Sequence, residues 1–332
     1  MFEPLPEHPE FYSKIPSGYK VEISGHMIEP MIYQPTTAGM EILTEHYKTK
    51  YAVDIRVIDQ SKAEVIGDNL KHRFAAFKTF LDSKKDEIEK EISAGKQIGF
   101  VLTHGCNHTI PLIISKDRDG NKVMTIFDST SGPRTKGYYL IANMFDDYNL
   151  MLNNGSRQKD GQSCMVDSIA ILKDALRMPD LAQYLITHKI MREERAREED
   201  EKEAGAAARP RQFFGTALTR DNFKLFLMPE ELLKTAQRSE FAEESKPDET
   251  KIITASNKTL EQKRGENRVT VHFDREEGGD LKINQYLHKK SWKYAKIISE
   301  ELEKRTPSVP SSSTRGAAAG AVSPTAEECL KL

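Results

Sequence analysis

One of the three cysteines in this chain stands where a nucleophile is expected. Cys164 lies in RQKDGQSCMVDSIAIL, residues 157–172, at the point where a polar loop meets an apolar run with helical spacing. A cysteine attacks only as its thiolate, and the amides at a helix N-terminus favour negative charge on the sulfur or on an oxyanion. A cysteine in this position can also be a small buried side chain. Its function therefore depends on the residues that lie beside it.

His108 and Asp128 are the partners that such a thiolate needs. His108 directly precedes the apolar stretch TIPLIIS, Asp128 ends the stretch KVMTIFD, and the Asp-Gly pair in the KDRDGN segment between them suits a tight reversal. In an antiparallel hairpin the start of one strand lies beside the end of the next, so we expect the two side chains to be neighbours. The pattern predicts His108 as the general base for Cys164 and Asp128 as the residue that orients it.

An acyl-transfer centre also needs hydrogen-bond donors for the oxyanion. Gln158 lies six positions before Cys164. Its side-chain amide is predicted to be one donor, and the backbone N–H of Cys164 is predicted to be the second. A histidine, an aspartate, a glutamine and a cysteine in this order predict nucleophilic acyl chemistry.

The motif HGCNH, residues 104–108, offers an alternative interpretation. His104, Cys106 and His108 alternate along the segment, and such a pattern can bind zinc. A structural zinc site normally has a fourth ligand, and the sequence contains no second cluster of cysteine and histidine. A turn between two strands explains the motif equally well, and we expect no metal.

Composition narrows the class of protein. The 332 residues hold 49 Lys and Arg against 51 Asp and Glu, so no global positive field favours nucleic acid as a partner. Since the sequence has no apolar run of about 18 residues, we expect no membrane span. The N-terminal stretch lacks the basic, apolar and small-residue order of a Sec signal peptide. The odd number of widely spaced cysteines suits a reducing compartment.

Hydrophobic periodicity predicts a mixture of helices and strands. The expected helices cover residues 36–51, 68–95, 136–150, 164–176, 223–244 and 283–305. The expected strands cover residues 51–59, 97–104, 108–115 and 122–129. We divide the chain into a flexible N-terminal arm (1–34), a helical regulatory segment (35–95), a catalytic core (96–185), a C-terminal regulatory region with a densely charged insertion (186–304) and a disordered tail (305–332).

These residues resemble a known family. Their order is that of the cysteine-protease clan that holds the Ulp/SENP SUMO proteases, the adenovirus-type proteases and the YopJ effectors. The stretches NHTIPLIISKDRDGNKVMTIFDST and QKDGQSCMVDSIAILKDAL are similar to the histidine, acid and nucleophile segments of the YopJ family. LMPEELLKTAQRSEF, SNKTLEQKRGENR and NQYLHKKSWKYAKII resemble later segments of that family, so the likeness spans roughly residues 35 to 300. It implies an α+β fold with an Ulp/adenain-like core, which has a mixed, mainly antiparallel sheet and a nucleophile helix, plus a helical regulatory region.

The resemblance also implies an activity. Members of the family are bacterial effectors that acetylate serine, threonine or lysine of host proteins. In this chain Cys164 would take the acetyl group from acetyl-coenzyme A (acetyl-CoA), with His108, Asp128 and Gln158 in the roles given above. Inositol hexakisphosphate (IP6) would be the activator. Phosphate-rich ligands bind Lys and Arg, and the candidate ligand residues are Lys71, Arg73, Lys159, Lys234, Arg238, Lys289, Lys290 and Lys293.

The same resemblance implies where the protein acts. A type III or type IV system would secrete it from the bacterium, and it would act in the host cell cytoplasm. Its substrates would be host proteins such as kinases or other signalling proteins.

Several positions depart from the family's pattern. Met165 follows the nucleophile where the family commonly has Gly, and the acid is Asp where Glu is common. Thr235-Ala236 replaces a frequent His-Thr, and Lys290-Ser291 replaces a frequent Lys-Arg. These changes affect the expected IP6 contacts more than the triad.

Two other functions remain open from the sequence. A ubiquitin- or SUMO-type isopeptidase uses the same triad, although those enzymes commonly place Trp directly after the catalytic histidine, and here Thr109 follows His108. A pseudoenzyme that only binds host proteins is the other alternative, and the departure at Met165 suggests it.

Overall fold

The computed structural model describes residues 5–60, 70–103, 108–130, 137–158, 160, 162–190, 222–245, 247–254, 256–272 and 281–305. Most of the predicted charged insertion, residues 191–221, lies outside these ranges, and so does the predicted tail beyond residue 305. Cys106, Cys329 and Lys159 also lie outside them, as do the first four residues of the HGCNH motif.

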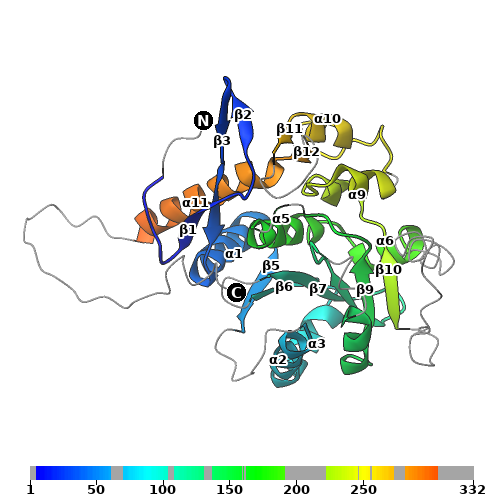
Figure 1. Cartoon of the computed structure of the whole chain (residues 1–332). Helices are drawn as coiled ribbons and strands as arrows, with labels where there is room; N and C mark the ends of the chain where they lie inside the picture. Colours follow the sequence, from blue (N-terminus) through cyan, green and yellow to red (C-terminus); the bar gives the residue numbers. More distant parts are fainter. Residues whose placement is uncertain are drawn as a thin grey trace, which may run out of the picture.

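The described chain begins with four strands and then mixes helices and strands (Figure 1). The strands are β1 (Tyr12–Pro16), β2 (Val21–Ile23), β3 (His26–Ile28), β4 (Met31–Pro35), β5 (Asp54–Asp59), β6 (Ile98–Thr103), β7 (Ile110–Lys116), β8 (Lys122–Ile126), β9 (Asn149–Asn153), β10 (Phe223–Phe226), β11 (Arg268–Val271) and β12 (Leu281–Asn284). The helices are α1 (Thr37–Tyr51), α2 (Leu70–Ser83), α3 (Lys85–Ser93), the 3-10 turn η1 (Ala142–Met144), α5 (Cys164–Ala175), α6 (Leu181–His188), α8 (Glu230–Leu233), α9 (Ser239–Glu244), α10 (Leu260–Gly265) and α11 (Tyr286–Arg305). Within the described ranges, no helix has the length and apolar character needed to cross a bilayer.

A six-stranded mixed sheet in the order β10-β9-β8-β7-β6-β5 forms the centre of the molecule. The β6–β7 and β7–β8 pairs are antiparallel, whereas the β5–β6, β8–β9 and β9–β10 pairs are parallel. The prediction of a mixed sheet is confirmed, but the prediction that it is mainly antiparallel is wrong. Parallel neighbours require long crossovers, such as the segment with α2 and α3 between β5 and β6. The pattern of residues within a strand does not reveal these crossovers.

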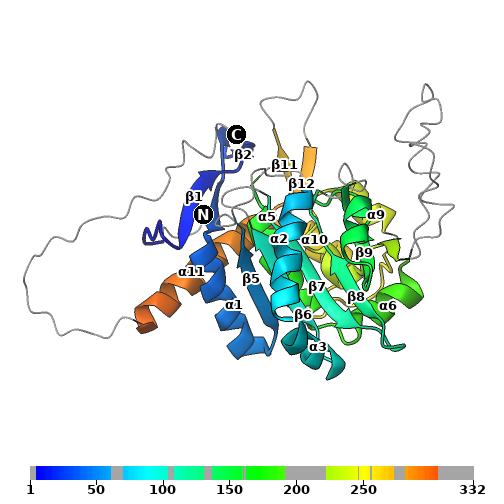
Figure 2. The same ribbon diagram turned by 90° about the horizontal axis from the view of Figure 1, so that it is seen from below.

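Helices cover both faces of this sheet (Figures 1 and 2). α2 and α3 pack on one face, against side chains that include Phe100 and Leu112. α1, α5 and α11 lie on the other face, where Val101 and Ile113 point. Successive residues of a strand face opposite sides of a sheet, so strands covered on both faces appear as continuous apolar runs. This explains the sequence pattern of β6 and β7.

β10 lies in a segment where the sequence favours helix, residues 223–244, and β9 begins within the last two residues of the predicted helix 136–150. The segment before β9 does contain the helical turn η1, but residues 150–153 of β9 are buried between β8 and β10. Apolar runs of four or five residues are too short for their periodicity to separate a helix from a strand. Pairing in the sheet decides the conformation of both segments: β9 pairs with β8, and β10 pairs with β9.

Strands β1 to β4 occupy much of the segment that the sequence assigns to a flexible arm. β1 pairs antiparallel with β4, and β4 packs on α11. The hydroxyl of Tyr12 lies 3.2 Å from Ser299 Oγ, and the hydroxyl of Tyr19 lies 2.9 Å from His288 Nε2; both partners belong to α11. Short two-stranded units depend on packing against another element for stability, and local sequence does not show this packing.

The turn between β7 and β8 sets the register on which the candidate site depends. The side chain of Asp117 accepts a hydrogen bond from the amide of Asp119 at 3.0 Å, and Gly120 has a φ of 85°, which other residues rarely adopt. In the resulting register Leu112 pairs with Ile126. The start of β7 therefore lies beside the end of β8, as the Asp-Gly pair predicts.

A buried ion pair ties the loop before the nucleophile to α5. The guanidinium of Arg157 is fully buried and donates to the two carboxylate oxygens of Asp167 at 3.0 and 2.6 Å. It also donates to Thr235 Oγ1 at 3.0 Å and to the carbonyl of Phe127 at 2.8 Å. Burial raises the pKa of Asp167, and the charge of Arg157 opposes that rise. One side chain thus joins four segments of the core.

We expect Arg157→Met to lower the free energy of unfolding by about 3–5 kcal/mol at neutral pH, because the Asp167 carboxylate stays buried without its partner. Since burial raises the folded-state pKa of Asp167, the cost is present above that pKa and is lost as pH falls through it. Urea unfolding at pH 7 and pH 5, followed by circular dichroism, measures both effects. Arg118→Met is the matched control, because Arg118 is exposed and pairs with Asp180 at the surface, and it should cost less than about 1 kcal/mol. Equal losses for the two variants would contradict the expectation.

Candidate active site

His108, Asp128 and Cys164 meet at one edge of the central sheet. His108 precedes β7, Asp128 follows β8, and Cys164 is the first residue of α5. His108 Nε2 lies 2.5 Å from Asp128 Oδ1, and the imidazole also hydrogen-bonds to the side chain of Cys164. With Nε2 on the carboxylate, Nδ1 is the ring nitrogen left for the sulfur. The three residues therefore have the mutual geometry of a nucleophile, a base and an orienting acid.

The environment of His108 favours its charged form. Burial favours the neutral imidazole, but the charge of Asp128 and hydrogen bonds to Asp128 and Cys164 outweigh burial and raise the pKa of His108 to about 9. The ring is then an imidazolium at neutral pH. A cation beside a cysteine stabilises the thiolate, which is the reactive form.

The Asp128 carboxylate is fully buried and is held in one orientation. Besides His108, Oδ1 accepts the amide of Thr130 at 2.9 Å, and Oδ2 accepts the hydroxyl of Tyr138 at 2.7 Å. Asn153 Nδ2 donates to the backbone carbonyl of Asp128 at 3.1 Å. Burial opposes ionisation, but His108 and the hydrogen bonds from Thr130 and Tyr138 hold the pKa of Asp128 well below its usual range. No spacing in the sequence relates Tyr138 or Asn153 to the triad, so neither residue could be predicted from it.

Arg73, one of the predicted ligand residues, lies behind His108. It belongs to α2, is 6% exposed, and donates through Nη1 to the backbone carbonyl of His108. This contact fixes the backbone that leads into β7. Arg73 supports the triad in this arrangement, and its ligand role stays a prediction.

Cys164 begins α5, as the sequence predicts, and is 5% exposed. Ser163 precedes it without a side-chain capping hydrogen bond, and the first turn closes through Asp167 N on the carbonyl of Ser163 at 2.8 Å. The amides at the start of a helix lack partners within the helix, so an oxyanion can bind there. Met165 is buried in the core shared by α1, α5 and α11. The core therefore accommodates a large side chain where the family commonly has Gly.

Gln158 is buried beside the nucleophile loop, and its side chain already has partners. Its Nε2 donates to the backbone carbonyl of Asp160 at 2.5 Å and to Asp160 Oδ1 at 3.0 Å. Its Oε1 accepts the hydroxyl of Ser129 at 2.7 Å. Gln158 must release Asp160 before it can donate to an oxyanion, and that role stays a prediction.

Three predicted ligand residues gather near the C-terminal end of α5. Lys234 Nζ lies 2.8 Å from Asp174 Oδ2. Lys290 of α11 is close enough to the same groups that its pKa falls to about 7, through burial first and then through repulsion by Lys173, Lys293 and Lys234. Burial and the neighbouring cations together disfavour the charged form of Lys290, and the Asp174 carboxylate offsets them only in part.

Two further cations that the sequence did not single out lie at the C-terminal end of α5: Lys173 in its last turn, and Arg177 two residues beyond it. Lys173 and Arg177 lie over the ring of Tyr51, 5.8 and 5.1 Å from its centroid. Their i, i+4 spacing at the end of the nucleophile helix was the available signal. We call Lys173, Arg177, Lys234, Lys290 and Lys293 the basic cluster. Because α5 has 12 residues, the cluster lies roughly 15 Å from Cys164 along the helix.

The remaining predicted ligand residues lie elsewhere. Lys71 is exposed on α2, and Lys289 Nζ contacts the carbonyl of Glu266 at 3.3 Å. Arg238 is next to the nucleophile loop, where its Nε donates to the carbonyl of Gln158 at 3.0 Å. Only Arg238 among these three lies beside the nucleophile loop.

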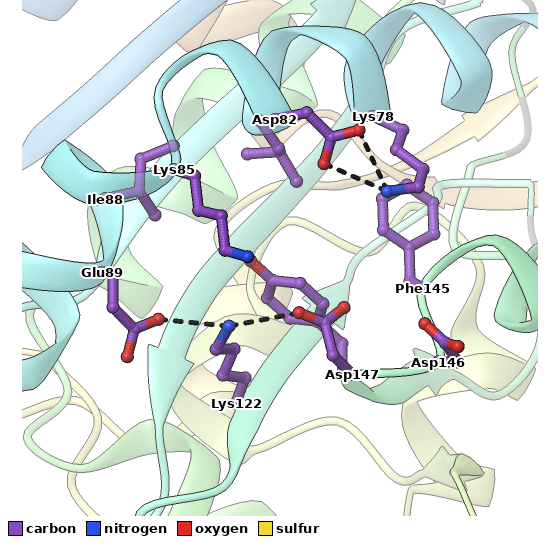
Figure 3. A pocket seen from close by; sticks show the side chains of 11 residues that line it. Lys78, Asp82, Lys85, Ile88, Glu89, Lys122, Phe145, Asp146 and Asp147 are labelled. Atoms are coloured by element: carbon purple, nitrogen blue, oxygen red, sulfur yellow. Dashed lines mark hydrogen bonds and ion pairs between the residues drawn. The ribbon is translucent and has the colours of Figure 1, made fainter.

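A hollow of about 300 Å³ lies at the other end of the sheet, between α2, α3 and the turn before β9 (Figure 3). Lys122, at the start of β8, bridges Glu89 at 3.2 Å and Asp147 at 3.1 Å, and Lys78 contacts Asp82 at 3.0 Å. The lining holds four carboxylates and three lysines. A phosphate-bearing ligand would be repelled by those carboxylates, so the hollow does not fit the predicted coenzyme A site.

The described residues, which exclude His104 and Cys106, hold no group of three or more His, Cys, Asp or Glu side chains arranged for a metal ion. His108, the described histidine of the HGCNH motif, contacts Asp128 and Cys164 instead.

We expect His108 to be protonated at pH 7.5 in the unmodified protein, because its pKa is about 9. Asp128→Asn should shift that pKa downward, since burial then acts without the opposing carboxylate charge. Because the folded-state pKa is raised, the stability that this contact provides is complete below about 6.5, the ordinary histidine value, and is lost as pH rises through about 9. NMR titration of isotope-labelled histidine from pH 5 to 10 measures the shift. Titration of His108 near its ordinary value in the unmodified protein would contradict this account.

Comparison with known proteins identifies the family. The family model described as YopJ Serine/Threonine acetyltransferase matches residues 35–296. Among solved structures, HopZ1a in complex with IP6 and CoA has a TM-score of 0.53 and 10% sequence identity, with 80% of this chain and 85% of that chain covered. A deletion variant of AvrA with IP6 and CoA has a TM-score of 0.47 and 14% identity, with 78% and 86% covered. A search of curated proteins gives no match.

The match covers most of the chain, including the triad and the described residues of the basic cluster. The likeness to HopZ1a shows that the overall fold is shared. The resemblance inferred from the sequence is therefore confirmed, and the chain belongs to the YopJ family of serine/threonine acetyltransferases.

Proposed function

We propose that this protein transfers an acetyl group from acetyl-CoA to serine, threonine or lysine side chains of host proteins, by way of a thioester on Cys164. The observation that carries the proposal is the imidazole of His108, held between Asp128 and Cys164 at the N-terminus of α5, in a chain of the YopJ family. In this proposal an Ulp/adenain-like cysteine-protease core is used for group transfer.

The first half-reaction loads the enzyme. The Cys164 thiolate attacks the acetyl carbonyl, and the oxyanion binds at the N-terminus of α5, where the backbone N–H of Cys164 is the first donor. The predicted second donor, Gln158, joins when it releases Asp160. Collapse of the intermediate expels the coenzyme A thiolate, which takes a proton from His108, and leaves an acetyl thioester on Cys164.

The second half-reaction discharges the enzyme. His108 is now neutral and accepts the proton of the host hydroxyl or amine as that group attacks the thioester. Asp128 stabilises the imidazolium that forms, and Tyr138 keeps the carboxylate oriented. Cys164 leaves as its thiolate, and the starting ion pair is restored.

The basic cluster is the proposed binding site for IP6. Lys173 and Lys234 share the carboxylate of Asp174, and burial together with the charges of Lys173, Lys293 and Lys234 lowers the pKa of Lys290 although Asp174 opposes this. A polyphosphate would supply the missing counter-charge. HopZ1a was crystallised with IP6 and CoA, which supports the same ligands here. Arg238, next to the nucleophile loop, is the predicted residue best placed for a coenzyme A phosphate.

We also infer the setting of the reaction from the family. A bacterial secretion system of type III or type IV delivers the protein, and it acts in the host cell cytoplasm on signalling proteins such as kinases. Incubation of purified protein with candidate kinases from host lysate, followed by mapping of acetylated residues, identifies the acceptors.

We expect the purified protein to acetylate itself or a protein acceptor when acetyl-CoA and IP6 are present, and Cys164→Ala to abolish the reaction, because the thioester cannot form. Intact-mass and peptide mass spectrometry detect the added acetyl groups. The Cys164 thioester should accumulate when no acceptor is available. Reaction of Cys164 with a ubiquitin or SUMO C-terminal probe, without acetyl transfer, would favour the isopeptidase instead. No reaction with either reagent would favour the pseudoenzyme.

We expect Lys290→Gln and Lys234→Gln each to weaken IP6 binding about 10-fold or more, because each removes a charge-assisted contact. Lys296→Gln is the matched control, since Lys296 is an exposed lysine of the same helix that approaches Glu300. Because the pKa of Lys290 is about 7 without ligand and a polyanion raises it, binding should take up protons and weaken as pH rises from 6 to 8. Isothermal titration calorimetry in buffers of different ionisation enthalpy measures both effects. Equal losses in Lys290→Gln and Lys296→Gln would place the site elsewhere.

A further inference from the structure

A second buried carboxylate lies directly behind the nucleophile. Asp160, four residues before Cys164, is 5% exposed. Its Oδ1 accepts the amides of Gln162 at 3.0 Å and Ser163 at 2.7 Å, and its Oδ2 accepts the hydroxyl of Ser163 at 2.7 Å. Gln162 and Ser163, which lead into α5, therefore both hydrogen-bond to this carboxylate.

Two segments far away in sequence hold Asp160 in place. Gln237 donates through Nε2 to Asp160 Oδ2, and its Oε1 accepts the Asp160 amide at 3.2 Å. His288 of α11 approaches the same oxygen, with Nε2 at 3.8 Å from Oδ2. The hydroxyl of Tyr19 lies 2.9 Å from the same nitrogen, His288 Nε2, and helps to hold the ring. Asp160 and His288 thus form an acid–imidazole pair that is separate from the pair of the triad.

These contacts orient the predicted oxyanion donors more directly than they orient the sulfur of Cys164. Asp160 takes the amides of the two residues before Cys164, so the N–H of Cys164 is the first amide left at this end of α5. Because the peptide bond is planar, the orientation of Ser163 determines where that N–H points. The Gln158 side chain, the other predicted donor, is also held by Asp160.

We propose that Asp160 is a positioning residue of the oxyanion pocket: it orients the peptide between Ser163 and Cys164 together with the Gln158 amide, and His288 of α11 keeps its carboxylate in place. The inference rests on the proposed acyl transfer by Cys164. It also connects the pocket to the basic cluster, because Lys290 lies two residues from His288 on α11. A displacement of α11 reaches the oxyanion donors through a single side-chain contact.

Two reagents that attack the same sulfur separate this role from a general loss of structure. p-Nitrophenyl acetate acetylates Cys164: the thiolate attacks the carbonyl carbon, an oxyanion forms, and p-nitrophenolate leaves. Iodoacetamide alkylates the same thiolate by displacing iodide, and no oxyanion forms. The ratio of the two rates, measured by mass spectrometry of the Cys164 peptide, therefore reports on the oxyanion donors.

We expect Asp160→Asn and His288→Leu to slow acetylation roughly 10- to 100-fold, while alkylation changes by less than about 3-fold, because misplaced donors affect only the reaction with an oxyanion. His288→Gln retains a donor for Asp160 and should keep the ratio within about 3-fold of the unmodified protein. Circular dichroism and thermal unfolding confirm that each variant is folded. If Asp160→Asn does not fold, the difference in the rate ratio between His288→Leu and His288→Gln still tests the proposal.

His46→Leu is the matched control. His46 of α1 contacts Glu301 of α11 at 2.9 Å, so this variant also removes an imidazole–carboxylate contact of α11, but one away from the nucleophile loop. Both rates should stay unchanged in it. The proposal would be overturned if acetylation and alkylation fell in parallel in the Asp160 and His288 variants, or if neither rate changed. If the unmodified protein reacts with p-nitrophenyl acetate but takes no acetyl group from acetyl-CoA, the proposed function fails and the role of Asp160 stands.

Discussion

The candidate site depends first on the antiparallel register of β7 and β8. Pairing of Leu112 with Ile126 brings the start of one strand beside the end of the other and sets His108 against Asp128. A slip of one residue would turn every side chain of one strand to the opposite face, and the turn at Asp117–Gly120 fixes the register against such a slip. The contact between imidazole and carboxylate is therefore a consequence of the register of strands that carry no catalytic residue themselves.

Helix α5 fixes the position of the nucleophile relative to these strands. Every residue of the helix is buried, with Cys164 at its first position and Lys173 and Asp174 near its last. A helix packed on all sides moves as a unit, since a dense core leaves little room for local adjustment. Charge balance in the basic cluster can in this way influence the position of a sulfur about three turns away. The proposed activator, which would bind outside the triad, could act on the nucleophile in this way.

Three buried aspartates surround the nucleophile loop, and each is satisfied by a different partner. Asp128 has His108, Asp167 has Arg157, and Asp160 has backbone amides together with Gln237. A buried carboxylate is costly unless it is paired or hydrogen-bonded, so each of these contacts excludes other conformations of the loop. The loop contains few apolar side chains, and its shape comes from these charges. The carboxylate of the triad, Asp128, therefore lies near two carboxylates that hold the loop in shape, Asp160 and Asp167. Their hydrogen-bond partners distinguish the three.

The sequence by itself determined the order of the chemical groups, the hairpin and the nucleophile helix, because each depends on local spacing: an Asp-Gly turn between apolar runs, and helical periodicity after a polar loop. Those local signals placed His108, Asp128 and Cys164, and with them the family. Tertiary structure alone decided the parallel neighbours of the sheet, the docking of β1 to β4 on α11, and the partners of Tyr138, Arg157 and Asp160. These contacts join segments far apart in the chain, for example Tyr19 with His288. Their energy comes from burial of paired polar groups, and a linear pattern of residue types does not record which groups are buried together.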